Sequence, residues 1–258
     1  MHGMSGERIT AKRIALITLA IAQAATPALL LAAGFERHNL GANTPIVPVD
    51  FTFIIWAFIH GASLVWAGWH LFAREGGGAL FQWIAVPVGV AFALNVLWLL
   101  AAHFGLLTAT APILLLTLAL LGHALIVSAA LVPTIARAER LLTLAMLGPQ
   151  VGWLTIVAFA NITEVAAARG FSFFGLSLET WTVLVLVLAA ALACAIAWAA
   201  RGPWGHAIAV GWALLGIFVA NLGADRVLIQ ATCGLAVLAV LITTLAARSA
   251  AADEQRSP

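Results

Sequence analysis

The chain has 258 residues, of which 64% are hydrophobic and only 9% are charged, and its formal net charge is +2. A soluble domain of this size does not need so much apolar surface, so the composition excludes an ordinary soluble enzyme and indicates an integral membrane protein. The basic residues are scattered and form no patch. We therefore expect a lipid bilayer, and no nucleic acid, as a partner.

Charged residues divide the chain into long apolar runs. Six uncharged runs are 21 to 23 residues long, which suits one bilayer crossing each. The seventh, 76–136, has 61 residues and must hold two helices, with a turn near His103, Phe104 and Gly105. The pattern predicts an all-α, polytopic integral membrane protein with about eight transmembrane helices. The first run lacks a convincing small-residue cleavage site, so we interpret it as a retained helix and not as a signal peptide.

The distribution of Lys and Arg predicts the topology. With the N-terminus inside, nine basic residues fall on the inner side and three on the outer side, while the acidic residues divide five and five. The inner ones are Arg8, Lys12, Arg13, Arg74, Arg137, Arg140, Arg201, Arg248 and Arg256, and the outer ones are Arg37, Arg169 and Arg226. Because cytoplasmic loops carry the excess of Lys and Arg, we expect both termini in the cytoplasm.

Polar and aromatic residues follow one face of the second and third predicted helices. In the second helix this stripe consists of Trp56, His60, Ser63, Ala67 and His70. In the third helix, Asn95 and Trp98 are three residues apart and are therefore neighbours on one face. At a rise of roughly 1.5 Å per residue, Trp56, Asn95 and Trp98 lie at similar depth in the outer half of the membrane.

The fifth predicted helix carries a matching stripe in "PQVGWLTIVAFAN", residues 149–161. At 100° per residue, Gln150, Trp153 and Asn161 fall on one side. An unpaired amide is costly in hydrocarbon, so this side must face the bundle or a cavity. Pro149 removes a backbone hydrogen bond and is expected to kink the helix, which opens room beside it.

These stripes predict a polar and aromatic cavity below the loop 35–50, which we interpret as a lid. The residues that we expect to contact a ligand are Phe53, Trp56, His60, Asn95, Trp98, Pro149, Gln150, Trp153 and Asn161. The tryptophans would supply stacking walls, and the amides and His60 would supply hydrogen bonds. The alternative is that the same side chains only join helices to one another.

Three motifs resemble the translocator protein family, also called TspO/MBR or tryptophan-rich sensory proteins. They are "PVDFTFIIWAFIH" at 48–60, "LNVLW" at 94–98 and "PQVGWLTIVAFAN" at 149–161. The family has Leu-Asn-x-x-Trp in its third helix, and Pro-Tyr-x-x-Trp followed by Asn in its fifth. The chain departs from the family pattern at Gln150 and His60, where the family has tyrosine, and it contains no tyrosine at all.

The resemblance implies a five-helix bundle with a pocket beneath the first loop, followed here by three extra helices. The implied parts are a cytoplasmic tail at 1–12, a TspO-like bundle at 13–166, a three-helix extension at 167–247 and a cytoplasmic tail at 248–258. Family members bind tetrapyrroles, so the implied ligand is a planar, porphyrin-like molecule. The longer bacterial relatives look closer than the short ones, which implies a bacterial inner membrane and a sensing, regulatory or transport role.

Other functions remain open from the sequence. One alternative is a transporter of a small hydrophobic molecule. Such a transporter would be uncoupled, because no helix carries a charged residue at mid-membrane that could couple ion movement. Another alternative is a membrane haem protein with His70 and His123 as axial ligands, although two histidines alone are a weak signal. No catalytic group and no metal-binding spacing is evident, so enzyme activity is undecided. Gly211 and Gly216 leave open whether the seventh helix packs within the chain or in a homodimer.

The topology gives a direct expectation for cysteine labelling. A cysteine at position 42 should react with a membrane-impermeant maleimide added from the periplasmic side, because the first loop is predicted to lie outside. A cysteine at position 253 should not react until the membrane is opened. The reverse pattern would refute the predicted orientation.

Overall fold

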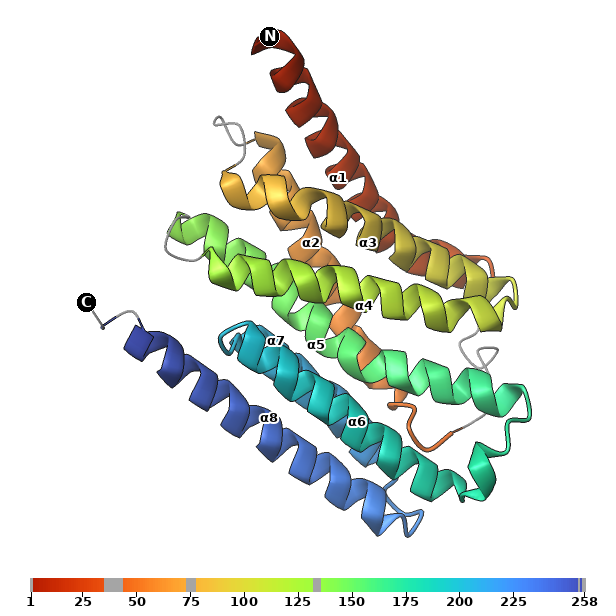
Figure 1. Ribbon diagram of the computed structural model, residues 1–258. Helices are drawn as coiled ribbons and strands as arrows, with labels where there is room; N and C mark the ends of the chain where they lie inside the picture. Colours follow the sequence, from red (N-terminus) through yellow and green to blue (C-terminus); the bar gives the residue numbers. More distant parts are fainter. Residues whose placement is uncertain (1, 35–43, 73–77, 132–135, 255, 257–258) are drawn as a thin grey trace. The chain divides into compact units, whose positions relative to one another are not determined.

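The apolar runs between charged residues fold into α-helices. In the computed structural model of the protein, the described residues are 2–34, 44–72, 78–131, 136–254 and 256. These ranges contain eight α-helices, two short 3-10 helices and no strand. In chain order they are α1 (His2–Ala32), η2 (Asp50–Ile54), α2 (Ile55–Phe72), α3 (Ala79–His103), α4 (Leu107–Ala130), α5 (Arg137–Ala168), η4 (Phe173–Gly175), α6 (Leu178–Ala199), α7 (Trp204–Ala220) and α8 (Val227–Glu254) (Figure 1).

The length and composition of the helices are those of membrane spans. Seven helices in the described part of the chain are long and apolar enough to cross a membrane. α7 is shorter, with 17 residues, which is about the lower limit for a crossing. The prediction of an all-α, polytopic membrane protein is therefore confirmed.

The longest uncharged run divides at the predicted place. α3 ends at His103 and α4 begins at Leu107. Between them Gly105 has a φ of 71°, a left-handed conformation that glycine adopts without strain from a side chain. The N–H of Leu106 donates to the carbonyl of Ala101 at 2.8 Å, which closes the end of α3. This bond pairs two backbone groups at the C-terminal end of α3 that the helix itself leaves without a partner.

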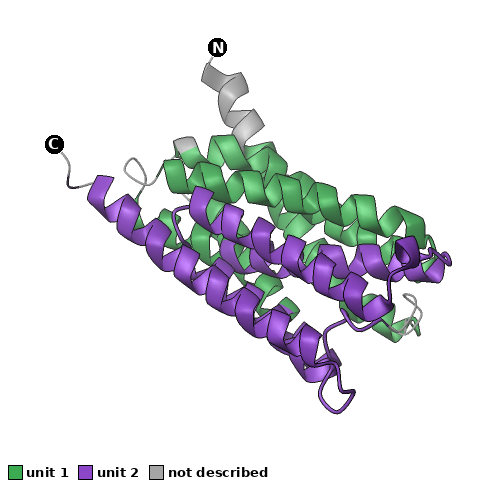
Figure 2. Ribbon diagram, turned by 60° about the horizontal axis from the view of Figure 1, so that its bottom comes forward, with its two compact units in different colours: residues 1–39, 56–147 green, residues 40–55, 148–258 purple. Residues whose placement is uncertain are grey.

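The chain forms two compact units that do not follow the order of the sequence (Figure 2). Unit 1 contains residues 1–39 and 56–147, and unit 2 contains residues 40–55 and 148–258. The last of the three boundaries falls inside α5, between residues 147 and 148 and next to Pro149, where the ring prevents one helical hydrogen bond. These units differ from the predicted division into 13–166 and 167–247, which follows family resemblance and stays a prediction.

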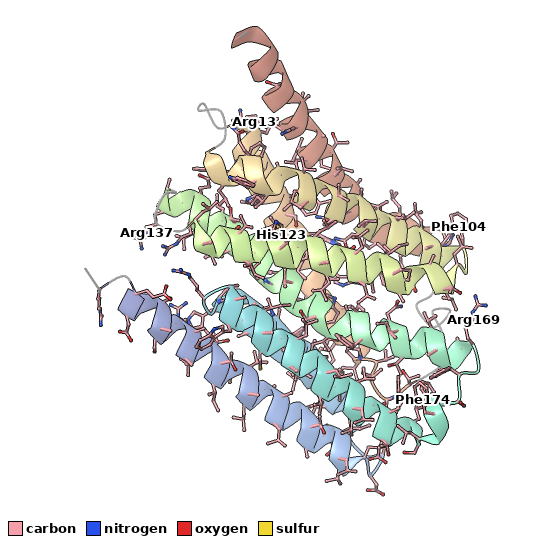
Figure 3. The ribbon with its side chains drawn as sticks, viewed as in Figure 1. Arg13, Phe104, His123, Arg137, Arg169 and Phe174 are labelled. Carbon is pink, nitrogen blue, oxygen red and sulfur yellow. The ribbon has the colours of Figure 1, made fainter. Side chains whose placement is uncertain are left out.

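Unit 1 is built around α3. This helix packs along both α1 and α4. The indole Nε1 of Trp66 in α2 donates to the hydroxyl of Thr143 in α5 at 3.0 Å, and both side chains are buried. Arg13 and Arg137 lie at one end of the unit and Phe104 at the other (Figure 3). The predicted orientation in the membrane stays a prediction.

Unit 2 combines α6, α7 and α8 with the second part of α5. α8 packs along both α6 and α7. At one end Arg201 forms an ion pair with Glu254 at 3.1 Å, and the guanidinium of Arg248 lies 5.5 Å from the ring centre of Trp204. The first contact joins the turn between α6 and α7 to α8, and the second joins the start of α7 to α8.

Glycines allow α5 and α7 to approach at backbone distance within unit 2. Gly148 and Gly152 are four residues apart on α5, the spacing that lets membrane helices pack closely. A Cβ atom at Gly148 would lie 3.1 Å from the backbone nitrogen of His206, and one at Gly152 would overlap the carbonyl oxygen of His206. From the other side, Gly205 faces the ring of Pro149. We did not predict this contact, although its Gly-x-x-x-Gly spacing is present in the sequence.

This close approach makes Gly152 sensitive to a single methyl group. We expect Gly152→Ala to destabilise the protein by about 1–3 kcal/mol, because α7 must move away from the added methyl group. The measurement is a lower thermal unfolding midpoint of the detergent-purified protein. Gly211→Ala in α7 is the matched control, since nothing lies within 4 Å of its Cβ position. Equal midpoints for the two variants would contradict the packing described here.

Candidate functional site

Four predicted site residues come together in unit 1. Trp56 and His60 come from α2, and Asn95 and Trp98 come from α3. The rings of Trp56 and Trp98 meet edge to face, with centres 6.1 Å apart and planes at 86°. The ring of His60 lies 6.3 Å from that of Trp56. The structure thus brings the stripes of two helices together, as their spacing predicts.

A fifth member of this group, Gln23 of α1, was not predicted. Its side-chain oxygen accepts a hydrogen bond from Nδ2 of Asn95 at 3.0 Å, and the residue is 1% exposed. Gln23 is the only amide in the apolar run that forms α1, and this was the signal in the sequence that could have identified it. The pair joins α1 to α3, and Asn95 lies three residues before Trp98 on the same helix.

Two buried N–H groups of this cluster have no acceptor. Neither Nε2 of Gln23 nor Nε1 of Trp98 has a hydrogen-bond partner among the described residues. A buried donor without an acceptor costs about 1–3 kcal/mol, and most such groups in proteins are paired. Both groups can therefore donate hydrogen bonds to an acceptor beyond the described residues.

The other predicted residues belong to unit 2. The ring of Phe53 meets that of Trp153 edge to face, with centres 5.2 Å apart and planes at 84°. Trp153 and Asn161 are 3% and 5% exposed, so the predicted stripe of α5 is buried. Gln150 is also buried, and its side-chain oxygen has no partner in the described chain. The polar face of α5 is consequently turned away from lipid, as expected.

Pro149 has a packing partner that explains its position. Its ring lies against Gly205 of α7, where a Cβ atom would come within 2.9 Å of the proline Cδ. α5 continues as one helix through Pro149 from Arg137 to Ala168. The described contact of this proline is thus between helices, and its predicted part in ligand binding stays a prediction.

The two histidines considered as haem ligands are in different surroundings within unit 1. His70 is 3% exposed, and its ring packs against Trp66 at 4.7 Å and Phe81 at 4.5 Å. His123 is exposed on α4, between the ends of that helix (Figure 3). The two histidines therefore differ in burial, and the haem alternative stays a prediction. Among the described residues there is also no group of three or more His, Cys, Asp or Glu side chains suited to a metal ion.

The fold and these clusters define a polytopic, all-α membrane protein with buried polar and indole groups. The chain matches the family model described as TSPO-like protein over residues 10–246. It therefore belongs to the TSPO-like protein family, as the three motifs predict. The match extends beyond residue 166, where we expected the resemblance to end, so the last three helices are part of the matching region. No curated protein and no solved structure matches the chain.

The bond between Gln23 and Asn95 can be tested by a double-mutant cycle. We expect Gln23→Leu and Asn95→Leu each to lower the free energy of unfolding. The loss in the double variant should be smaller than the sum of the two single losses, by about 0.5–1 kcal/mol. Gln23→Leu combined with Thr117→Val is the control, because Thr117 bonds to Ile113 within its own helix. Additivity in both pairs would show that the amides do not interact.

Proposed function

We propose that this protein binds a hydrophobic, planar ligand of the tetrapyrrole class inside the membrane, in a sensing, regulatory or transport role. The observation that carries the proposal is the presence of two buried donors without a partner among the described residues, Nε2 of Gln23 and Nε1 of Trp98, together with the edge-to-face contact between the rings of Trp98 and Trp56. Membership of the TSPO-like family supports the proposal. The motif "LNVLW" at 94–98, by which the chain resembles the translocator proteins, includes Asn95 and Trp98.

The chemistry of a porphyrin suits both features of this cluster. Its apolar ring gains from contact with indole edges and faces, and its carboxylate side chains are strong hydrogen-bond acceptors. Gln23 and Trp98 would donate to a carboxylate oxygen, and His60 offers a further polar group. Phe53, Pro149, Gln150, Trp153 and Asn161 belong to unit 2, and their participation is a separate part of the proposal.

The predicted membrane and orientation belong to the same proposal. We infer a bacterial inner membrane from the resemblance to the longer bacterial relatives. We infer that both termini lie in the cytoplasm, because nine of the twelve basic residues fall on that side. The uncharged central parts of the apolar runs support a binding protein or an uncoupled carrier over a proton-coupled or ion-coupled transporter.

Titration of protoporphyrin into the detergent-purified protein, followed by tryptophan emission, tests the function. We expect saturable quenching in the wild type. Gln23→Leu and Trp98→Phe should each raise the dissociation constant, by about threefold to tenfold, because each loses one hydrogen bond to the ligand. Trp83→Phe on the same helix is the control for Trp98→Phe, since Trp83 is 68% exposed. Asn95→Ala and Trp153→Ala should weaken binding more than they weaken folding.

Two results would refute this function. Quenching that does not saturate and is equal in all variants would mean that the porphyrin only partitions into the micelle. Normal binding by the folded fraction of Asn95→Ala and Trp153→Ala, together with lower thermal stability, would mean that these residues only pack the helices.

A further inference from the structure

Residues 44–54, which we call the anchored segment, are bonded to α7 through their backbone. The N–H of Val49 donates to the carbonyl of Gly216 at 3.3 Å, and the indole Nε1 of Trp212 donates to the carbonyl of Thr52 at 2.8 Å. Gly216 permits this approach, since a Cβ atom there would lie 2.6 Å from Thr52 and 2.9 Å from Pro48. The loop 35–50 was predicted as a lid; residues 35–43 lie outside the described residues, and 44–50 are tied to α7.

A second attachment lies at the start of the anchored segment. Asn221, which is fully buried, donates from Nδ2 to the carbonyls of Pro45 and Ile217, each at 2.8 Å. Its side-chain oxygen accepts from Arg226 at 3.2 Å. Gln230 of α8 donates to the backbone carbonyl of Asn221 at 2.8 Å. Asn221 is therefore fixed by α7 and α8 and in turn fixes Pro45.

The far end of the anchored segment reaches a predicted ligand residue. Phe53 meets Trp153 of α5 edge to face, and Phe51 meets Trp212 of α7 in the same manner, with ring centres 5.8 Å apart. The carbonyl that Trp212 holds belongs to Thr52, the residue between these two phenylalanines. The position of Phe53 against Trp153 consequently depends on the hydrogen bonds between α7 and the anchored segment.

We propose that Trp212 and Asn221 are positioning residues of the ligand site. They hold the anchored segment on α7, and through it they place Phe53 against Trp153. The last three helices then serve ligand binding directly and are not a separate module. The proposal rests on the proposed function for the ligand, whereas the anchoring is measurable without one.

Amide hydrogen exchange on the full-length protein in detergent tests the anchoring. Trp212→Phe removes the indole donor, and Gly216→Ala adds a methyl group that must displace Thr52. We expect exchange at the Val49 and Thr52 amides to accelerate at least about tenfold in both variants, because their hydrogen bonds open more often. Trp204→Phe, at the other end of α7, should leave exchange unchanged. Unchanged exchange in Trp212→Phe and Gly216→Ala would overturn the proposal.

Protoporphyrin titration of the same variants tests the consequence for binding. We expect Trp212→Phe, Asn221→Ala and Phe53→Leu each to raise the dissociation constant, by about threefold to tenfold. The double variant Trp212→Phe with Phe53→Leu should bind no more weakly than Phe53→Leu alone, because Trp212 acts through Phe53. A double variant in which the two effects multiply would overturn the positioning role.

The two parts of the proposal can fail separately from the function. If the wild type shows no saturable binding, the tetrapyrrole function is refuted, and the exchange comparison alone upholds or overturns the anchoring. If the wild type binds and Trp212→Phe binds equally well despite faster exchange, the function stands and the positioning role is overturned.

Discussion

Hydrocarbon provides no hydrogen bonds, so every polar atom within these helices must find its partner in the protein. Most hydroxyl groups satisfy this constraint locally: Thr26, Ser63 and Thr117 each donate to the carbonyl four residues earlier in their own helix. Larger polar groups cannot do so and instead join different helices, as Asn95 does with Gln23 and Trp66 with Thr143. Nε2 of Gln23 and Nε1 of Trp98 depart from this pattern, because neither has a partner among the described residues.

The sequence predicted the helices and part of the cluster, because both depend on spacing along a single element. Charged residues bound each apolar run, and the three-residue interval of Asn95 and Trp98 placed them on one face of α3. The sequence did not predict Gln23 as a partner of Asn95, because pairing between helices depends on the register of α1 against α3. A single amide in an apolar run indicates that the side chain needs a hydrogen-bond partner, but it does not indicate which residue that partner is.

The attachment of residues 44–54 to α7 could not be predicted for the same reason. Its acceptors are backbone carbonyls of Pro45 and Thr52, which have no residue-specific signal, and the donors are more than 150 positions away in the chain. The resemblance also directed attention to the first five helices, while the TSPO-like match covers residues 10–246. Gly216, which we considered as a contact for another subunit, packs against Thr52 and Pro48 of its own chain.

The contact of Gly148 and Gly152 with His206 has a mechanical consequence. Two helices that touch through backbone atoms, with Pro149 seated on Gly205 beside them, cannot slide by one residue without bringing a side chain into the space of a glycine. The second part of α5 and the start of α7 must therefore move together as one rigid body.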